Sequence, residues 1–283
     1  NSTSLMDMTG YFAGKIPNPF SHAPMMLLAF IGIRYLVLTL SRFNLCNTYR
    51  DRILLFIFFS MPSVGVWSSV HSKESVGVFI MSILTAFLIK VNLESKTYPN
   101  IVEVIALFLC VLFKPQYLIA LISVYVFVLI SRRCCLAAIQ QLVLAAVIIG
   151  FQTTILYYAQ PTIDLVALQM YRHFDSATAQ STRENLFFAA GDFYRHAPYG
   201  MFISFFGPTI QEAANSPSKL LAFVESSVLV MIISYYIATM LKRIVQLKFN
   251  SHIFSLLFLT FFWLLFVHYP FGVFNPGSAI RYR

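Results

Sequence analysis

Residues 113–133 read FKPQYLIALISVYVFVLISRR, and this stretch indicates how the chain folds. After Pro115 it contains no acidic or basic residue until Arg132 and Arg133. Such a run is typical of a helix that crosses a membrane, where about 20 apolar residues span the hydrocarbon core. Pro115 breaks any helix that continues from the preceding apolar run, because proline lacks an amide donor and clashes with the turn before it. We therefore predict short helices at 99–113 and 117–131, which form a tight hairpin or a pair that does not fully cross.

The composition extends this pattern to the whole chain. Of its 283 residues, 58% are hydrophobic and 11% are charged, whereas an ordinary soluble domain is about 25% charged. We therefore exclude a soluble enzyme and predict an all-α fold, a polytopic transmembrane helix bundle of about eight spans. The predicted spans are 24–41, 53–70, 75–93, 99–113, 117–131, 136–158, 219–241 and 252–270.

The basic residues between these runs predict the orientation, because short cytoplasmic connections of membrane proteins are rich in Lys and Arg. Alternate connections carry them: Arg42, Arg50 and Arg52; Lys96; Arg132 and Arg133; Lys242, Arg243 and Lys248. We assign these connections to the cytoplasm, and the Trp67–Glu74 turn and the chain end to the outside. The net charge of +9 then reflects topology, and we expect a lipid bilayer and no nucleic acid as partner.

Residues 159–218 form the one sizeable segment between predicted spans, an outer loop. Residues 196–219, HAPYGMFISFFGPTIQEAANSPSK, are rich in aromatics and interrupted by Pro and Gly. This pattern suggests a segment that lies on the membrane surface or re-enters it. We treat 1–283 as a single integral membrane domain. Because no initiator Met opens the chain and it stops just after a turn, we expect a fragment of a longer protein.

Arg34 is a candidate binding residue inside the first predicted span. An intramembrane arginine normally faces the bundle interior or a water-filled cavity, where it can hold an anionic substrate group. The alternatives are a buried pair with Glu103 or Glu225, or a side chain that extends to the cytoplasmic face.

The turn PSVGVWSSVHSKES, residues 62–75, carries a second candidate group. Lys73 supplies a positive charge and His71 a titratable imidazole, both near a helix start that favours anions. We therefore predict that Lys73 binds a phosphate and that His71 transfers a proton. The alternative is an interfacial Trp67 anchor followed by a capped helix.

The outer loop supplies the remaining charged candidates. Asp175 and Asp192 are predicted as acid–base groups, and Arg172, Arg183 and Arg195 as ligands for the phosphates of an activated sugar donor. The alternative is a solvated loop, which is also rich in charge. The four cysteines show no metal or redox spacing, so we expect neither a metal ion nor another cofactor.

Three stretches together resemble one bacterial family: residues 62–75, FKPQ at 113–116 and NPGSAIRYR at 275–283. The family comprises polytopic membrane proteins of surface-polysaccharide gene clusters, broadly O-antigen or capsule polymerases and related lipid-linked glycosyltransferases. The resemblance implies functional roles for Lys73, Arg281 and Arg283. It also implies packed transmembrane helices with an outward-facing cavity, in the bacterial inner membrane.

The function implied is a membrane glycosyltransferase or polysaccharide polymerase that acts on undecaprenyl-pyrophosphate-linked sugars. Arg281 and Arg283 would then bind the pyrophosphate, since a guanidinium matches phosphate oxygens with two bonds; the alternative is simple attraction to anionic headgroups. Two other functions are weighed: a flippase or transporter of lipid-linked oligosaccharides, and a non-catalytic subunit that binds polysaccharide assembly proteins. A transferase needs a base, whereas a carrier does not.

Overall fold

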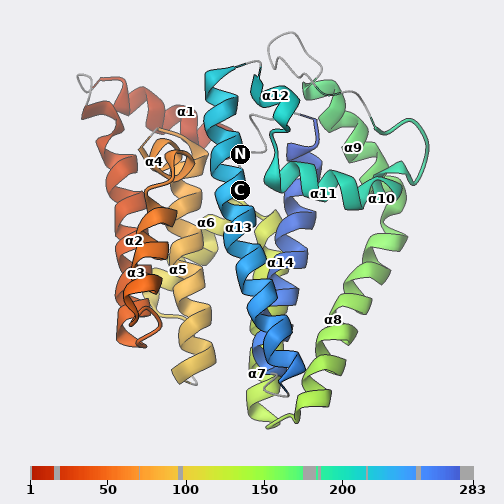
Figure 1. Cartoon of the computed structure of the whole chain (residues 1–283). Helices are drawn as coiled ribbons and strands as arrows, with labels where there is room; N and C mark the ends of the chain where they lie inside the picture. Colours follow the sequence, from red (N-terminus) through yellow and green to blue (C-terminus); the bar gives the residue numbers. More distant parts are fainter. Residues whose placement is uncertain are drawn as a thin grey trace. The chain divides into compact units, whose positions relative to one another are not determined.

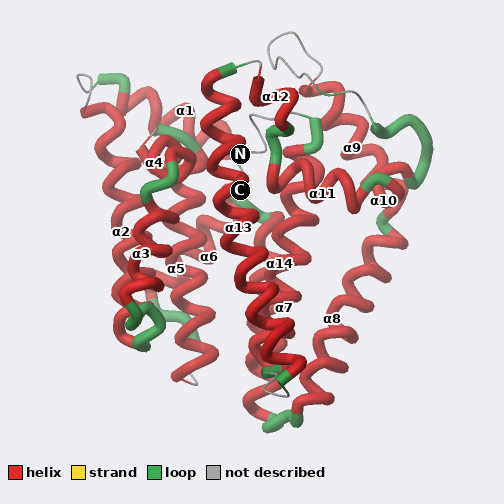
Figure 2. The backbone as a smooth tube through the Cα atoms, in the orientation of Figure 1, coloured by secondary structure: helices red, strands yellow, loops and turns green. Residues whose placement is uncertain are grey.

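The computed structural model describes residues 2–15, 20–69, 71–94, 98–174, 183, 186–214, 216–246 and 250–274, and in these ranges it contains helices and loops but no strand (Figures 1 and 2). The predicted all-α fold is thus confirmed. The chain divides into two compact units, Asn1–Cys135 (unit 1) and Leu136–Arg283 (unit 2).

Five helices in the described ranges are long and apolar enough to cross a membrane. They are Phe20–Arg42, Lys73–Glu94, Gln116–Arg133, Ala138–Tyr158 and Pro217–Arg243. Two further apolar helical stretches, Ile101–Phe113 and Ser251–Phe261, are shorter than a span. The chain is therefore a multi-pass helical membrane protein, and the predicted count of eight spans is not confirmed by the described residues.

Unit 1 is built around α5 (Lys73–Glu94), which packs against α2, α4, α6 and α7. The other elements of this unit are α1 (Ser2–Ala13), η1 (Phe20–His22), α2 (Ala23–Arg42), α3 (Tyr49–Phe59), α4 (Pro62–Ser69), α6 (Ile101–Phe113) and α7 (Gln116–Arg133). Gly32 allows α2 to approach α5, because a Cβ there would lie 2.7 Å from the Cα of Phe79. Small residues at such contacts are typical of helix packing in membranes.

The predicted span at 53–70 is divided into two helices in the structure. α3 ends at Phe59 and α4 begins at Pro62. The physical reason is Pro62, which has no amide hydrogen to continue α3 and whose ring excludes the helical turn before it. α3 also begins earlier than predicted, because the Thr48 side chain accepts a hydrogen bond from the Asp51 amide and caps the helix.

The predicted hairpin at Lys114–Pro115 is present. Asn100 caps α6 through a reciprocal capping box with Glu103, and α6 ends after 13 residues at Phe113. At about 1.5 Å per residue this helix is about 20 Å long, shorter than the hydrocarbon core. The chain then turns at Lys114 and Pro115, and α7 runs back from Gln116.

The ends of α2, α5 and α7 lie together in unit 1; the basic residue of the second connection, Lys96, lies outside the described residues. Arg42 at the end of α2 pairs with Glu94 at the end of α5. Arg132 at the end of α7 donates to the carbonyls of Val91 and Asn92, at 2.9 and 2.6 Å. The assignment of this end to the cytoplasm stays a prediction.

Unit 2 contains three long helices, α8 (Ala138–Tyr158), α13 (Pro217–Val245) and α14 (Ser251–Gly272). The starts of α8 and α14 lie at the same end, since the Ser251 hydroxyl donates to Gln141 Oε1 at 2.7 Å. The predicted outer loop contains four helices between its described residues: α9 (Gln160–Phe174), α10 (Asp192–Arg195), α11 (Ala197–Phe206) and α12 (Ile210–Ala214).

The apolar helix α11 packs directly on α14. A Cβ at Gly200 would lie 1.7 Å from the ring of Tyr269, and the Tyr269 hydroxyl donates to the Phe193 carbonyl at 3.0 Å. Phe187 and Phe274 complete an aromatic core around Tyr269. The described residues of segment 196–219 therefore pack within unit 2, and the predicted surface or re-entrant position of this segment in a membrane stays a prediction.

Candidate functional site

One stretch that carries the family resemblance, FKPQ, lies beside the helix that begins at Lys73 in another. Lys114, from FKPQ, lies against the second turn of α5, where a Cβ on Gly77 would be 3.3 Å from Lys114 Cε. Gly77 comes one helical turn after Lys73 and shares its face of α5. We call the group His71, Lys73, Gly77 and Lys114 the α5 site. It brings together two lysines that are far apart in the sequence.

Lys114 is the deeper of the two lysines, with only 6% of its surface exposed. It caps the end of α6, its amide donating to Cys110, and its carbonyl accepts the Tyr117 amide of α7 at 3.0 Å. A buried ammonium is stabilised only by hydrogen bonds and opposite charge. The hairpin backbone therefore fixes a cation beside the first turns of α5, where it can contribute to anion binding.

His71 is held just before α5 by contacts to α1 and η1. Its amide hydrogen bonds to His22 Nδ1 at 3.2 Å, and its Nε2 lies 3.2 Å from Thr9 Oγ1. Thr9 donates its hydroxyl proton to the Met6 carbonyl at 2.9 Å. The hydrogen-bond pattern thus assigns the proton of a neutral His71 to Nε2, which donates to Thr9. His71 Nδ1 is then an acceptor, and it is buried with no hydrogen-bond partner among the described residues.

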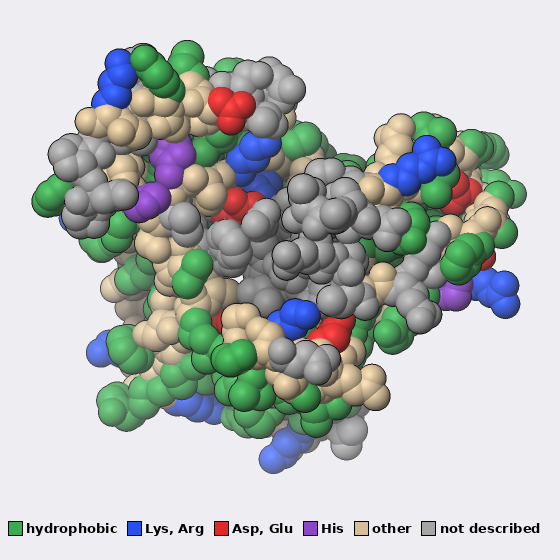
Figure 3. Space-filling model, turned by 90° about the horizontal axis from the view of Figure 1, so that it is seen from above, with side chains coloured by type: hydrophobic (Ala, Val, Ile, Leu, Met, Phe, Trp, Pro, Cys, Tyr) green, Lys and Arg blue, Asp and Glu red, His purple; other side chains and the backbone are tan. Residues whose placement is uncertain are grey.

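Figure 3 looks down on the molecule and shows charged and histidine side chains among hydrophobic ones on the face that it presents. Lys73 and His71 are both partly buried. The predicted pair of a phosphate-binding lysine and a histidine base is thus supplemented by Lys114. The sequence contained the relevant feature, a lysine at a proline break between two apolar helices.

Arg34 does not belong to this site. It lies on the exposed face of α2 between Phe30 and Leu38, which are also exposed. It does not point into the interior of unit 1, where the prediction placed it. The alternative, an ion pair between Arg34 and Glu103, is also wrong, because Glu103 is paired with Lys90.

The Lys90–Glu103 pair is a buried polar cluster that the sequence predictions missed. Lys90 Nζ lies 3.2 Å from Glu103 Oε1 and 2.6 Å from the Tyr35 hydroxyl, which donates to the same oxygen at 2.9 Å. Asn100 Nδ2 donates to the Tyr35 oxygen at 2.9 Å. The cluster joins α2, α5 and α6 near the ends of α2 and α5. Lys90 inside a predicted span was the available indication.

Arg183 in unit 2 is bound by the protein itself. Its Nε and a terminal nitrogen hold the two Glu212 oxygens at 2.7 and 2.9 Å, and its other terminal nitrogen donates to the Gly272 carbonyl. Burial alone raises the pKa of Glu212, but hydrogen bonds from Arg183 and the Thr209 amide outweigh this and leave the pKa lowered. The prediction of Arg183 as a phosphate ligand is corrected here: its guanidinium ties α12 to the end of α14.

Asp192 acts as a local cap in the structure. Its Oδ2 accepts the amides of Phe188 and Ala189 at 3.0 and 2.8 Å. These backbone hydrogen bonds, from Ala189 and then Phe188, lower the pKa of Asp192. A carboxylate stabilised in this way is a weak base near neutral pH, so the geometry does not favour the predicted proton transfer. Arg172 and Arg195 are exposed.

The remaining predicted residues, Asp175, Arg281 and Arg283, lie outside the described residues. Comparison with known proteins gives no match: no family model, no curated protein and no solved structure is similar to the chain. The helices therefore define the class, a multi-pass helical membrane protein. Its activity is a matter for proposal from the α5 site.

Proposed function

We propose that the chain is a membrane glycosyltransferase or polysaccharide polymerase that uses undecaprenyl-pyrophosphate-linked sugars in the bacterial inner membrane. The observation that carries the proposal is the contact between Lys114 and Gly77, one turn from Lys73. It supports a site in which two cations face the same membrane layer. A pyrophosphate on a lipid is the kind of anion that such a site suits.

The reaction needs a leaving group and a base, and the α5 site offers a group for each. An acceptor hydroxyl attacks the anomeric carbon of the donor sugar, and the bond from that carbon to the pyrophosphate oxygen breaks. The lipid pyrophosphate leaves with the bonding electrons, and the Lys73 and Lys114 ammonium groups stabilise its charge. The hydroxyl proton passes to the imidazole of His71, the predicted base of the α5 site.

The charged residues of unit 2 have different places in this proposal. Arg172 and Arg195 are exposed and can contact a glycan acceptor. Arg281 and Arg283 are proposed to bind the donor pyrophosphate on the strength of the family resemblance alone. Asp175 is proposed as a second acid–base candidate, because Asp192 is engaged as a cap.

The test is sugar transfer by the purified protein in liposomes that contain a polyprenyl-pyrophosphate-linked sugar. Lys73→Ala and Lys114→Ala are expected to lower transfer by about a hundredfold each, since a lost charge contact to a phosphate is comparable to a lost oxyanion donor. Lys15→Ala is the matched control, because Lys15 is an exposed lysine of the same unit whose ammonium lies over the Tyr11 ring. This variant should keep full activity.

His71→Gln separates a transferase from a carrier. Glutamine can still donate to Thr9 but cannot accept a proton from an attacking hydroxyl. A transferase should then lose turnover while it still binds the donor. Normal movement of the lipid-linked sugar across the bilayer, with no transfer by the wild-type protein, would replace the proposal by a carrier. Full transfer by both lysine variants would also contradict it.

A further inference from the structure

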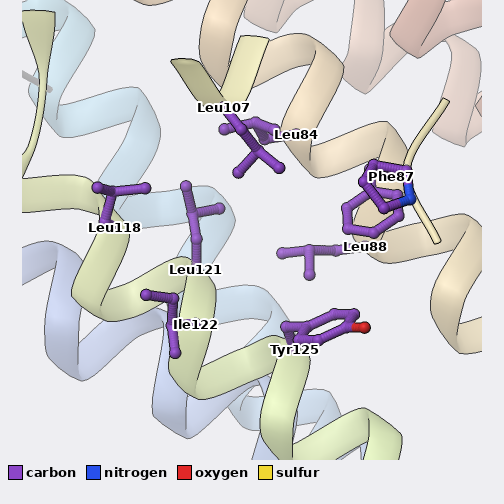
Figure 4. A pocket seen from close by; sticks show the side chains of 9 residues that line it. Leu84, Phe87, Leu88, Leu107, Leu118, Leu121, Ile122 and Tyr125 are labelled. Atoms are coloured by element: carbon purple, nitrogen blue, oxygen red, sulfur yellow. The ribbon is translucent and has the colours of Figure 1, made fainter. Parts of the chain in front are cut away.

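An apolar cavity lies inside unit 1 between α5, α6 and α7 (Figure 4). Its volume is about 250 Å³, and its lining includes Leu84 and Phe87 of α5, Leu107 of α6, and Leu118, Leu121 and Tyr125 of α7. Every other lining side chain is apolar. Cavities with such linings stay free of water and take hydrocarbon instead.

The cavity lies at the depth of the hydrocarbon core. Both α5 and α7 are candidate membrane spans; the lining residues of α5 lie near its middle, and those of α7 run from its first turn to its middle. Ile122, at the rim of the cavity, has 57% of its surface exposed, so a hydrocarbon chain can enter from the side of unit 1. The surrounding medium at this depth is lipid chain, which makes a hydrocarbon chain the natural occupant.

The α5 site lies directly beyond one end of this cavity. Leu118 follows Pro115 by one helical turn, about 5 Å along α7. Leu84 follows Gly77 by two turns, about 10 Å along α5. An anion held by Lys73 and Lys114 would thus be attached to a chain that begins within reach of the cavity. The two cations select a phosphate-bearing lipid over a neutral one.

The cavity is too small and too apolar for the sugar. Sites for drug-sized molecules are usually about 300–1,000 Å³ and contain several polar groups. Sugar hydroxyls buried among leucines would lose their hydrogen bonds to water, which costs free energy. A segment of one hydrocarbon chain meets neither objection.

We propose that this cavity binds the first prenyl units of the donor lipid, with the donor pyrophosphate at Lys73 and Lys114. The inference rests on the proposed function, which supplies the prenyl donor. It adds a site that selects the prenyl chain of the donor. By fixing the lipid on one side of the pyrophosphate, the cavity positions the anomeric carbon on the other side. Recognition of the donor is then divided between cations at the α5 site and leucines below it.

The probe is farnesyl pyrophosphate, in binding measurements with the purified full chain. Ile122→Trp places a large ring at the cavity entrance from an exposed position, so it should leave the core of unit 1 intact. It is expected to weaken probe binding about tenfold, as a changed fit in an apolar pocket does. The matched control is Ile119→Trp, an α7 residue that is 48% exposed and does not line the cavity. It should change binding less than about twofold.

A photoreactive farnesyl pyrophosphate on the wild-type protein gives a second measurement that needs no variant. Labelling should map to residues 84–125. Equal binding by the two tryptophan variants, or labelling confined to unit 2, would overturn the proposal. Displacement of the probe by phosphatidylglycerol at equal concentration would also overturn it, in favour of an ordinary acyl chain.

Failure of the proposed function gives a different result. If the protein transfers no sugar but Ile122→Trp still weakens probe binding, the proposed prenyl-binding cavity stands and the proposed transferase activity is wrong. If transfer occurs and depends on Lys73 and Lys114 but not on Ile122, the proposed transferase activity stands and the proposed prenyl-binding cavity is wrong.

Discussion

An ion pair joins separate segments in each unit, and the two pairs differ in how deeply they are buried. In unit 1, Lys90 and Glu103 are 9% and 0% exposed and are completed by the Tyr35 side chain and the Asn100 amide. In unit 2, Arg183 and Glu212 are completed mainly by backbone groups, the Gly272 carbonyl and the Thr209 amide. The first pair joins three apolar helices, whereas the second fastens a short helix to the end of α14.

The comparison shows how the protein itself can engage a charged side chain. An arginine that holds a carboxylate with two bonds and a carbonyl with a third directs most of its five donors to protein groups. Arg183 is such a cation. Charge content in a loop or span therefore does not identify a site until the partners of each charge are known.

The largest effect is expected from Glu103→Leu in unit 1. This change leaves the Lys90 ammonium buried without its carboxylate, which destabilises by about 3–5 kcal/mol. The measurement is the thermal unfolding of the purified protein in detergent. The double variant Lys90→Met with Glu103→Leu should recover most of the loss, because apolar residues of similar size replace a buried pair at little cost. A single variant as stable as the wild type would show that the pair contributes nothing.

The next largest effect is expected from alanine substitutions at glycines in close helix contacts, one in each unit. Gly32→Ala would push a methyl group to 2.7 Å from the Phe79 Cα, and Gly200→Ala would place one 1.7 Å from the Tyr269 ring. Each should cost about 1–3 kcal/mol, because overpacking forces helices apart. Gly150→Ala in α8 is the control, since nothing lies within 4 Å of its Cβ position. If all three variants have the same unfolding temperature, the close helix contacts at Gly32 and Gly200 do not limit stability.

An effect of comparable size is expected from Arg183→Lys in unit 2. Lysine keeps the charge but loses the two-bond fork to Glu212 and the bond to Gly272, so stability should fall by about 1.5–3 kcal/mol. Arg195→Lys at an exposed position should change it by less than about 0.5 kcal/mol. Both are measured by thermal unfolding, with donor binding as a second readout. Lost donor binding at unchanged stability would return Arg183 to the substrate-binding role.

The smallest effect is a response of unit 2 to acid. The pKa values of Glu212 and Asp192 are lowered from 4.5 and 3.8 in the folded protein. A lowered carboxyl pKa stabilises the fold above the ordinary value, and this stabilisation is lost as pH falls through the folded value. Unfolding temperature should therefore decline below about pH 4.5, where these carboxylates begin to protonate on unfolding. Glu212→Gln should flatten the decline; an equal decline in that variant would exclude Glu212 as its source.

The apolar runs predicted most of the helices, because run length and composition depend on local sequence alone. The break at Pro62 follows from the same local chemistry and could have been predicted. The ion pairs could not, because they depend on which helices become neighbours. Arg183 meets a carboxylate 29 residues away and a carbonyl 89 residues away.

The candidate site shows the same limit. His71 and Lys73 stand in one turn of sequence, so a local pattern was enough to select them. Lys114 joins them only because the α6–α7 hairpin ends beside Gly77. The role of Asp192 as a cap depends on the path of the chain through Phe188 and Ala189, which the charge pattern does not describe.

The short hairpin has a consequence for the bilayer itself. α6 has 13 residues and α7 has 18, lengths of about 20 and 27 Å, against a hydrocarbon core about 30 Å thick. A hydrophobic stretch shorter than the bilayer is accommodated by local thinning of the lipid around it. The bilayer should therefore be locally thinner above Lys114, with its surface lowered there. A lipid headgroup would descend to the lysine there without leaving its own leaflet, and the activity should rise in bilayers of shorter-chain lipids.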